Sequence, residues 1–181
     1  VVAAAQWLDR NHPSDRPRIL FGASMGGSTV IHAMRNGLAA DAMILLDPLL
    51  DVLDSMMKVG QVETGFPPLL FSIAARAAIQ RYGLPHRETS PLAMAKTLDL
   101  PILLMQDWED PVTRSPFAAE LASNNARVIL ARVPAISVDE ACLDGKEAWG
   151  THVAAHPCRP DWTRETVSTF VQSVVNMAPN S

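Results

Sequence analysis

Two hydrophobic patterns alternate along this chain: short, unbroken apolar runs and longer stretches in which apolar residues recur every three or four positions. The short runs are typical of strands buried on both faces. They are residues 18–21, 42–46, 101–106 and 127–133. The longer stretches predict helices. They are residues 1–10, 25–38, 115–123 and 161–175. Strands that alternate with helices predict an α/β fold, in which helices cover both faces of a parallel sheet.

A helical insert is predicted between the second and third strands, at residues 49–99. This segment holds helix-like patches at 49–59, 69–82 and 92–98, which are broken by glycines and prolines. A chain of 181 residues is long enough for one domain with a core of its own. We therefore predict a single domain over 1–181 that contains the insert.

The composition argues against several classes of function. The chain is 48% hydrophobic and carries a net charge of −4, and no Lys/Arg run would supply a nucleic-acid-binding surface. No apolar run approaches the length of a membrane span. No group of His and Cys residues has the spacing of a metal site, so neither a metal nor an organic cofactor is expected.

Residues 22–26 read Gly-Ala-Ser-Met-Gly and match the pattern G-x-S-x-G, after a predicted strand and before a predicted helix. In that setting the serine lies on a sharp, strained turn above the sheet edge. Side chains at Gly22 and Gly26 are expected to collide with the neighbouring strand or helix. We predict Ser24 as a nucleophile and the Met25 N–H, at a helix N-terminus, as a donor to an oxyanion. The alternative is a glycine turn that cradles phosphate, although no Gly-Lys-Ser/Thr follows.

A nucleophilic serine needs a base and an acid from later in the chain, in the order Ser, Asp or Glu, His. His152 comes after the last predicted strand, follows Gly150 and Thr151, and precedes the final helix. We predict His152 as the base. His156 is the alternative, but it is expected to cap a helix or pack next to Pro157.

Two aspartates that follow predicted strands are candidates for the acid. Asp110 lies on the loop after residues 101–106, from which a carboxylate can reach a histidine on the next loop, so we predict Asp110. Asp107 and Glu109 on the same loop are expected to be solvated. Asp47 is the rival because it also ends a strand; otherwise it would cap a helix or form a turn ahead of a proline.

In this order the three motifs resemble those of α/β-hydrolases, and most of all bacterial serine hydrolases related to dienelactone hydrolase, acylaminoacyl peptidase and prolyl oligopeptidase. The matching residues are 22–27, Ser90, Pro91, 101–105, 110–112, 150–152, Trp162, Val167 and Phe170. The resemblance implies an α/β-hydrolase fold in which Ser24, Asp110 and His152 form a triad. It implies cleavage of a carboxylic ester, or an amide or thioester, of a small-molecule acyl substrate. Acyl transfer or perhydrolysis with the same triad, and binding or assembly by a non-catalytic domain, are the alternatives.

The resemblance also implies further strands ahead of Val1, which would supply a second oxyanion N–H, so we interpret the chain as truncated at its N-terminus. Without those strands, the strand before Ser24 would be an exposed sheet edge through which copies of the chain could form a homo-oligomer. The insert at 49–99 occupies the place of a lid in this family. Its apolar residues predict an acyl pocket, or else only core packing. They are Met56, Met57, Phe66, Leu69, Leu70 and Phe71.

Two cysteines, Cys142 and Cys158, flank His152 in the sequence. Free thiols are typical of cytoplasmic proteins, and the cytoplasm is the location that we predict. A disulfide between them would brace the loop of His152 by about 3 kcal/mol. It would also indicate an oxidising compartment and a secreted protein.

Overall fold

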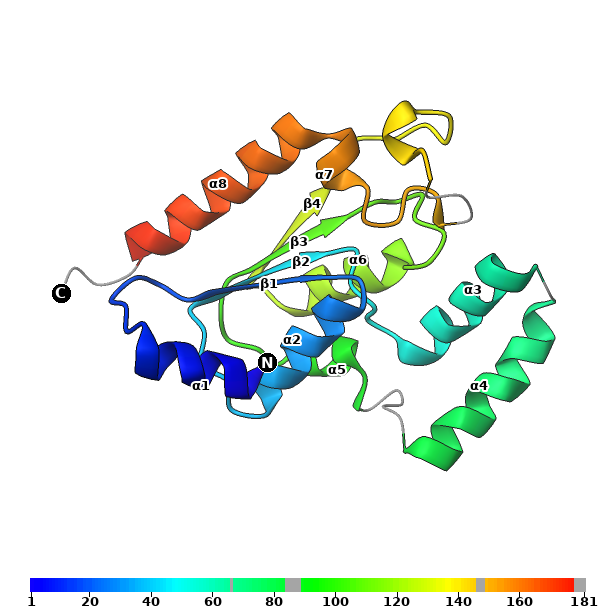
Figure 1. Cartoon of the computed structure of the whole chain (residues 1–181), viewed down its shortest axis with the longest axis horizontal. Helices are drawn as coiled ribbons and strands as arrows, with labels where there is room; N and C mark the ends of the chain where they lie inside the picture. The colour runs from blue at the N-terminus through cyan, green and yellow to red at the C-terminus, as the bar shows by residue number, and fades with distance from the viewer. Residues whose placement is uncertain (66, 84–88, 146–148, 178–181) are drawn as a thin grey trace.

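The structure, a computed structural model, describes residues 1–65, 67–83, 89–145 and 149–177 (Figure 1). In these residues the strands form a four-stranded parallel sheet in the order β1-β2-β3-β4. They are β1 (Ile19–Ala23), β2 (Ala42–Leu46), β3 (Ile102–Gln106) and β4 (Val128–Arg132). The parallel sheet confirms the fold class that the apolar runs predicted.

The two central strands, β2 and β3, are buried along their whole length and build a core on each face of the sheet. Successive side chains of a strand point to opposite faces. Ile44 and Leu103 therefore belong to the core under α7 and α8, whereas Leu45 and Leu104 belong to the core under α2, α5 and α6 (Figure 1). These helices are α2 (Met25–Arg35), α5 (Pro91–Ala95), α6 (Ser115–Asn124), α7 (Ala155–Cys158) and α8 (Pro160–Met177). Helices thus cover both faces, as predicted.

The first helix, α1 (Val2–Asn11), lies beside α2. Its Ala5 packs against Ala33 at the end of α2 and against Leu38 in the loop that follows. This loop also contains Gly37, whose φ of 85° turns the chain toward β2. The helix predicted to reach Leu38 therefore ends earlier, at Arg35.

The segment predicted as an insert contains two different parts. Helices α3 (Val52–Thr64) and α4 (Pro68–Tyr82) pack on each other as a hairpin that projects from the domain (Figure 1). Helix α3 begins later than its apolar pattern predicts because the Asp51 side chain accepts the Asp54 N–H at 2.8 Å and caps it. In contrast, α5 buries Leu92 and Ala95 in the core beside α2.

Two short elements between β4 and α8 are not predicted by the sequence pattern. They are the 3₁₀ turn η2 (Ala141–Leu143) and α7. Both are too short to show a hydrophobic period, and α7 contains a His-Pro pair that indicates a loop. Contacts with the sheet decide their structure, since Leu143 and Ala155 are buried in the core under α8.

Strands β1 and β4 are the edges of the sheet in the described residues. Phe21 of β1 is 59% exposed. Association of copies through the β1 edge stays a prediction. None of the helices in the described ranges is both long and apolar enough to cross a membrane.

Candidate active site

Four loops meet at the carboxyl ends of the parallel strands, which is the edge where α/β sheets bind ligands. Ser24 directly follows β1, and Asp47 directly follows β2. Asp110 lies on the loop after β3, and His152 lies on the long connection between β4 and α7. The sheet therefore brings together four residues that are far apart in the chain.

Ser24 lies on a strained turn between β1 and α2, with φ 51° and ψ −123°. Its N–H donates to Leu46 O at 2.9 Å, which fixes the turn to β2. A Cβ at Gly22 would lie 2.6 Å from the backbone oxygen of Gly26, so the predicted crowding at Gly22 is present. At Gly26 a Cβ would meet no atom within 4 Å, and the collision predicted there is wrong. The crowded second position is Gly27, whose Cβ would lie 2.6 Å from Pro48 Cβ.

A chain of two hydrogen bonds joins the three predicted residues. His152 Nε2 lies 2.8 Å from Ser24 Oγ, and His152 Nδ1 lies 2.7 Å from Asp110 Oδ2. An ionised carboxylate only accepts hydrogen bonds, so Nδ1 must be the donor and Nε2 is left to accept the serine proton. The His152 and Asp110 side chains are 3% and 0% exposed, and water hardly competes for these bonds.

The Asp110 carboxylate is held on both oxygens. Oδ1 accepts the N–H groups of Val112 at 2.7 Å and Thr113 at 3.0 Å, and Oδ2 accepts the Thr113 hydroxyl at 2.6 Å. Gln106 Nε2 donates to Thr113 Oγ1 at 3.1 Å. Bonds from an Asp to the backbone two and three residues later are usual in turns, so Asp-Pro-Val-Thr is a pattern from which Thr113 could have been found.

Asp47 and His156, the alternative candidates for the acid and the base, do not take part in the hydrogen bonds between Ser24, His152 and Asp110. Asp47 is fully buried, and its carboxyl accepts the N–H groups of Asp107 at 2.8 Å and Val153 at 3.1 Å. Burial first, and the nearby Asp110 second, raise the pKa of Asp47 well above its ordinary value. His156 is exposed on α7.

Two further residues near Ser24, His152 and Asp110 differ from expectation or were not predicted. Asp107 is only 2% exposed, so the expectation that it is solvated is wrong, whereas Glu109 is exposed as expected. Asp107 Oδ1 accepts the Glu109 N–H at 3.0 Å, and the Asp107 N–H donates to Asp47 Oδ1 at 2.8 Å, which holds this residue against the end of β2. The Trp149 ring lies 5.8 Å from the His152 ring, and the Trp149 carbonyl accepts the His152 N–H at 3.0 Å.

Among the residues that the structure describes, two groups of side chains have ligand atoms close enough to be considered for a metal. Those of Asp47, Asp110 and His152 lie within 4.8 Å of one another, but internal hydrogen bonds already use their atoms. In the second group the two sulfurs, of Cys142 and Cys158, are bonded to each other and offer no thiolate. We assign no metal to either group.

An apolar pocket of about 550 Å³ lies between α2 and α3, beside Ser24. Met25 and Leu49 line it, and both adjoin the serine: Met25 is the next residue, and the Leu49 N–H donates to Ser24 O at 3.2 Å. The opposite wall is one face of α3. It consists of Val52, Ser55, Met56, Val59 and Gly60.

The residues predicted to line an acyl pocket are divided among several places. Met56 lines the pocket beside Ser24. Phe71 lies against α3, where a Cβ at Gly60 would be 2.4 Å from its ring. Leu69 and Leu70 are exposed on α4. Met57 is half-buried on α3, and Phe66 lies outside the described residues.

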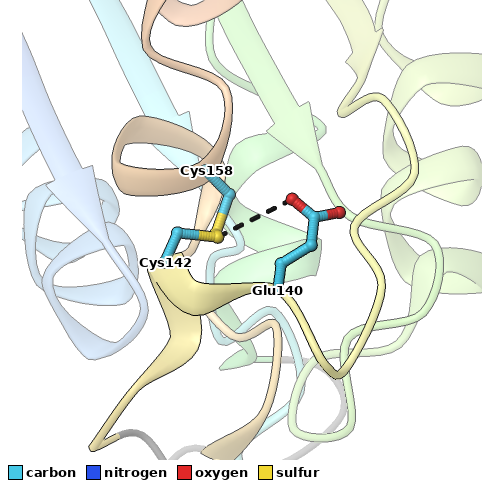
Figure 2. Close-up of side chains that lie close together, drawn as sticks. All are labelled: Glu140, Cys142 and Cys158. Atoms are coloured by element: carbon cyan, nitrogen blue, oxygen red, sulfur yellow. Dashed lines mark hydrogen bonds between the residues drawn. A yellow bond between two sulfur atoms is a disulfide. The ribbon is translucent and has the colours of Figure 1, made fainter.

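Cys142 and Cys158 form a disulfide across a separation of 16 residues (Figure 2). It joins η2 to the last residue of α7, and His152 lies between the two cysteines in the chain. The structure therefore has the bridged form, and the loop of His152 is closed by a covalent bond.

An ion pair lies beside this disulfide. Glu140 accepts two hydrogen bonds from the Arg159 guanidinium, at 2.6 and 2.7 Å, and one from the Ser137 N–H at 2.8 Å. The Arg159 bonds, more than the Ser137 bond, lower the pKa of Glu140 to about 2. The Glu140 carboxylate lies 3.8 Å from Cys142 Sγ (Figure 2), a contact rather than a hydrogen bond because a bridged sulfur carries no proton. Disulfide and ion pair together hold η2 to the α7–α8 corner.

Comparison with known proteins supports the fold. No family model and no curated protein matches the sequence. The structure is similar to an esterase from Pyrococcus furiosus, with a TM-score of 0.68 and 17% identity, covering 96% of this chain and 60% of that one. It is similar to the Pyrococcus horikoshii acylaminoacyl peptidase, with a TM-score of 0.64 and 17% identity, covering 98% and 27%. A puromycin-hydrolysing peptidase from Mycobacterium tuberculosis is similar with a TM-score of 0.63 and 20% identity, covering 96% and 25%.

These likenesses show the α/β-hydrolase fold that the sequence predicted. The chain spans about 60% of the length of the P. furiosus esterase.

The disulfide yields a stability prediction. Replacing Cys142 and Cys158 by alanine should lower the free energy of unfolding by about 3 kcal/mol, because the unfolded chain regains the entropy of an open loop. Urea unfolding measures the difference. Dithiothreitol should destabilise the wild type to the same extent and leave the double variant unchanged. An equal response of both proteins to the reductant would contradict the prediction.

Proposed function

We propose that this chain, which has the α/β-hydrolase fold, belongs to a serine hydrolase that cleaves a carboxylic ester, or an amide or thioester, through an acyl-enzyme. The observation that carries the proposal is the pair of short hydrogen bonds from Ser24 through His152 to Asp110. These bonds give the serine a base and give the base an orienting carboxylate. The esterase and peptidases to which the fold is similar are in keeping with this chemistry.

The proposed reaction has two halves. In the first, Ser24 Oγ attacks the acyl carbon while His152 Nε2 takes its proton, and His152 then returns this proton to the leaving alcohol or amine. In the second, water attacks the acyl-serine by the same route and the acid leaves. Asp110 keeps the imidazole in the required tautomer and stabilises its charged form. Met25 is the first residue of α2, so its N–H has no partner within the helix and is proposed to bind the oxyanion.

We propose that the apolar pocket between α2 and α3 receives the acyl part of the substrate, and that the α3–α4 hairpin covers it as a lid. Support comes from the position of the pocket, whose lining begins at Met25 and Leu49 next to the nucleophile. Support also comes from its lining, because flexible Met side chains among apolar Val and Leu side chains suit aliphatic chains of varied shape. The proposed substrate class is a small ester with an aliphatic acyl group.

We further propose that the protein works in an oxidising compartment. The Cys142–Cys158 disulfide supports this location over the cytoplasm that we predicted for free thiols. Two free thiols in protein isolated without reductant would contradict the proposal.

The nucleophile is tested by labelling. A fluorophosphonate probe should label the wild type at Ser24, and Ser24→Ala should abolish labelling and lower hydrolysis of a short p-nitrophenyl ester by about 10³-fold or more. Ser123→Ala, at an exposed serine on α6, is the control and should behave as the wild type. Hydrolysis by Ser24→Ala at the parental rate would overturn the proposal. A wild type that the probe does not label would favour the non-catalytic alternative.

The acid is tested by an isosteric change. Asp110→Asn should lower kcat by about 10³–10⁴-fold with little change in KM, because an amide N–H facing Nδ1 favours the wrong tautomer of His152. The exposed Glu109 provides the control Glu109→Gln, which should keep kcat within about twofold. The role assigned to Asp110 is wrong if Asp47→Asn loses more activity than Asp110→Asn.

The pocket is tested by filling it. Val59→Trp should slow labelling of Ser24 by an octyl fluorophosphonate about 10-fold relative to an ethyl one, because the longer chain loses its apolar site. Ile73→Trp is the matched control, since Ile73 lies in the same hairpin but is 62% exposed. Relative rates are measured by mass spectrometry of the labelled peptide. An equal effect of Val59→Trp on both probes would contradict the assignment.

A further inference from the structure

Asp47 lies at the site near Asp110, and the proposed reaction does not use its carboxyl group. It is fully buried, although an Asp almost never is unless paired. Its backbone has a φ of 41°, which is uncommon for residues other than glycine. Its N–H donates to Met105 O at 3.0 Å and so continues the pairing of β2 with β3. The position is thus held on the sheet while its side chain turns into the site.

The Asp47 side chain bridges the two loops that carry the other members of the site. Oδ1 accepts the N–H of Asp107, three residues before Asp110, and Oδ2 accepts the N–H of Val153, directly after His152. These partners lie 60 and 106 residues away in the chain. One side chain at the end of β2 therefore links the loop after β3 to the loop before α7.

Backbone strain marks the same place. In the described residues, the non-glycine residues with positive φ are Ser24, Asp47 and Val153, and all three lie at this site. Val153 is the most unusual of them, because a β-branched residue at φ 49° is a genuine outlier. Such conformations persist only where surrounding bonds hold them. The bond from Val153 N–H to Asp47 is one that holds the chain in the direction that places His152 toward Ser24.

We propose that Asp47 is a positioning residue, whose two backbone hydrogen bonds fix the loops of Asp110 and His152 relative to each other. This inference rests on the proposed function, because the aligned groups are those of the proposed triad. Asp47 acts through the two loops and does not contact the substrate.

The charge of Asp47 follows from its surroundings. The titratable groups that face it are Asp110, Asp107 and His152. Burial and the two aspartates raise its pKa, and the two N–H bonds oppose this only in part. Because the folded state holds the Asp47 proton more tightly than the unfolded chain, Asp47 costs stability as the pH rises above its ordinary pKa of 3.8.

The test is Asp47→Asn, which keeps the size of the side chain but turns an NH₂ group toward one of the two N–H donors. Ser24 labelling by an ethyl fluorophosphonate and kcat for a short ester should fall about 10–100-fold, the effect of a catalytic group displaced by about 1 Å. KM should stay within about twofold. The matched control is Asp41→Asn at the other end of β2, where Asp41 accepts the Arg18 N–H at 2.6 Å far from the site. It should stay within about twofold in every measurement.

The pH profile separates positioning from a charged role. If Asp47 acts only by holding the two loops, Asp47→Asn should leave the midpoint of the acid limb of kcat/KM unchanged. Removal of a charged Asp47 would lower that midpoint, and a shift of more than about 0.5 pH unit would overturn the proposal in favour of Asp47 as the acid. Activity equal to wild type in Asp47→Asn would overturn it as well.

Amide hydrogen exchange tests whether Asp47 holds the two loops, and it does so without measuring activity. In the wild type, the N–H groups of Asp107 and Val153 should be protected from exchange, and Asp47→Asn should speed exchange at both while leaving the strands unchanged. Unprotected amides at these two positions in the wild type would overturn the proposal, even if the variant does not fold. A wild type that is protected there but is not labelled at Ser24 would refute the proposed function and leave the bridge in place.

Discussion

Three backbone hydrogen bonds close the carboxyl end of the parallel sheet: Ser24 N–H to Leu46 O, Asp47 N–H to Met105 O, and Val133 N–H to Gln106 O. They continue the strand pairing by one residue beyond β1, β2 and β4. The side chains that follow the strands therefore start from a common, rigid edge. The hydrophobic cores on both faces hold that edge in place, because β2 and β3 are buried along their whole length.

The site concentrates polar and strained groups on this rigid base. Carboxyl groups, a buried histidine and left-handed backbone each cost free energy, and each is balanced here by a specific contact. Asp110 has three donors besides His152, and Asp47 has two. The loop of His152, which has no strand to hold it, is tied by hydrogen bonds and by the Cys142–Cys158 disulfide. Preorganisation of this kind is what the proposed proton transfer between Ser24 and His152 requires.

Patterns in the sequence were sufficient to predict the strands and the long helices. They were also sufficient to select Ser24, Asp110 and His152, which the structure brings together. Ser24, Asp110 and His152 each follow a predicted strand, and side chains in such positions meet at one sheet edge. The expectations for Gly26 and Asp107 failed because each depends on a contact between distant segments. The crowded position is Gly27 against Pro48, and Asp107 is buried where its N–H donates to Asp47, 60 residues away.

The sequence alone determined the α/β architecture, because unbroken apolar runs specify strands buried on both faces and periodic ones specify the helices that cover them. It also identified the candidate nucleophile, whose turn is a local feature of five residues. Only the tertiary structure showed that Asp110, and not Asp47, is the hydrogen-bond partner of His152, and that the two cysteines are bridged. It also showed how α3 and α4 pack on each other. These outcomes depend on distances of a few ångströms between residues that are far apart in the chain, and no periodicity records such distances.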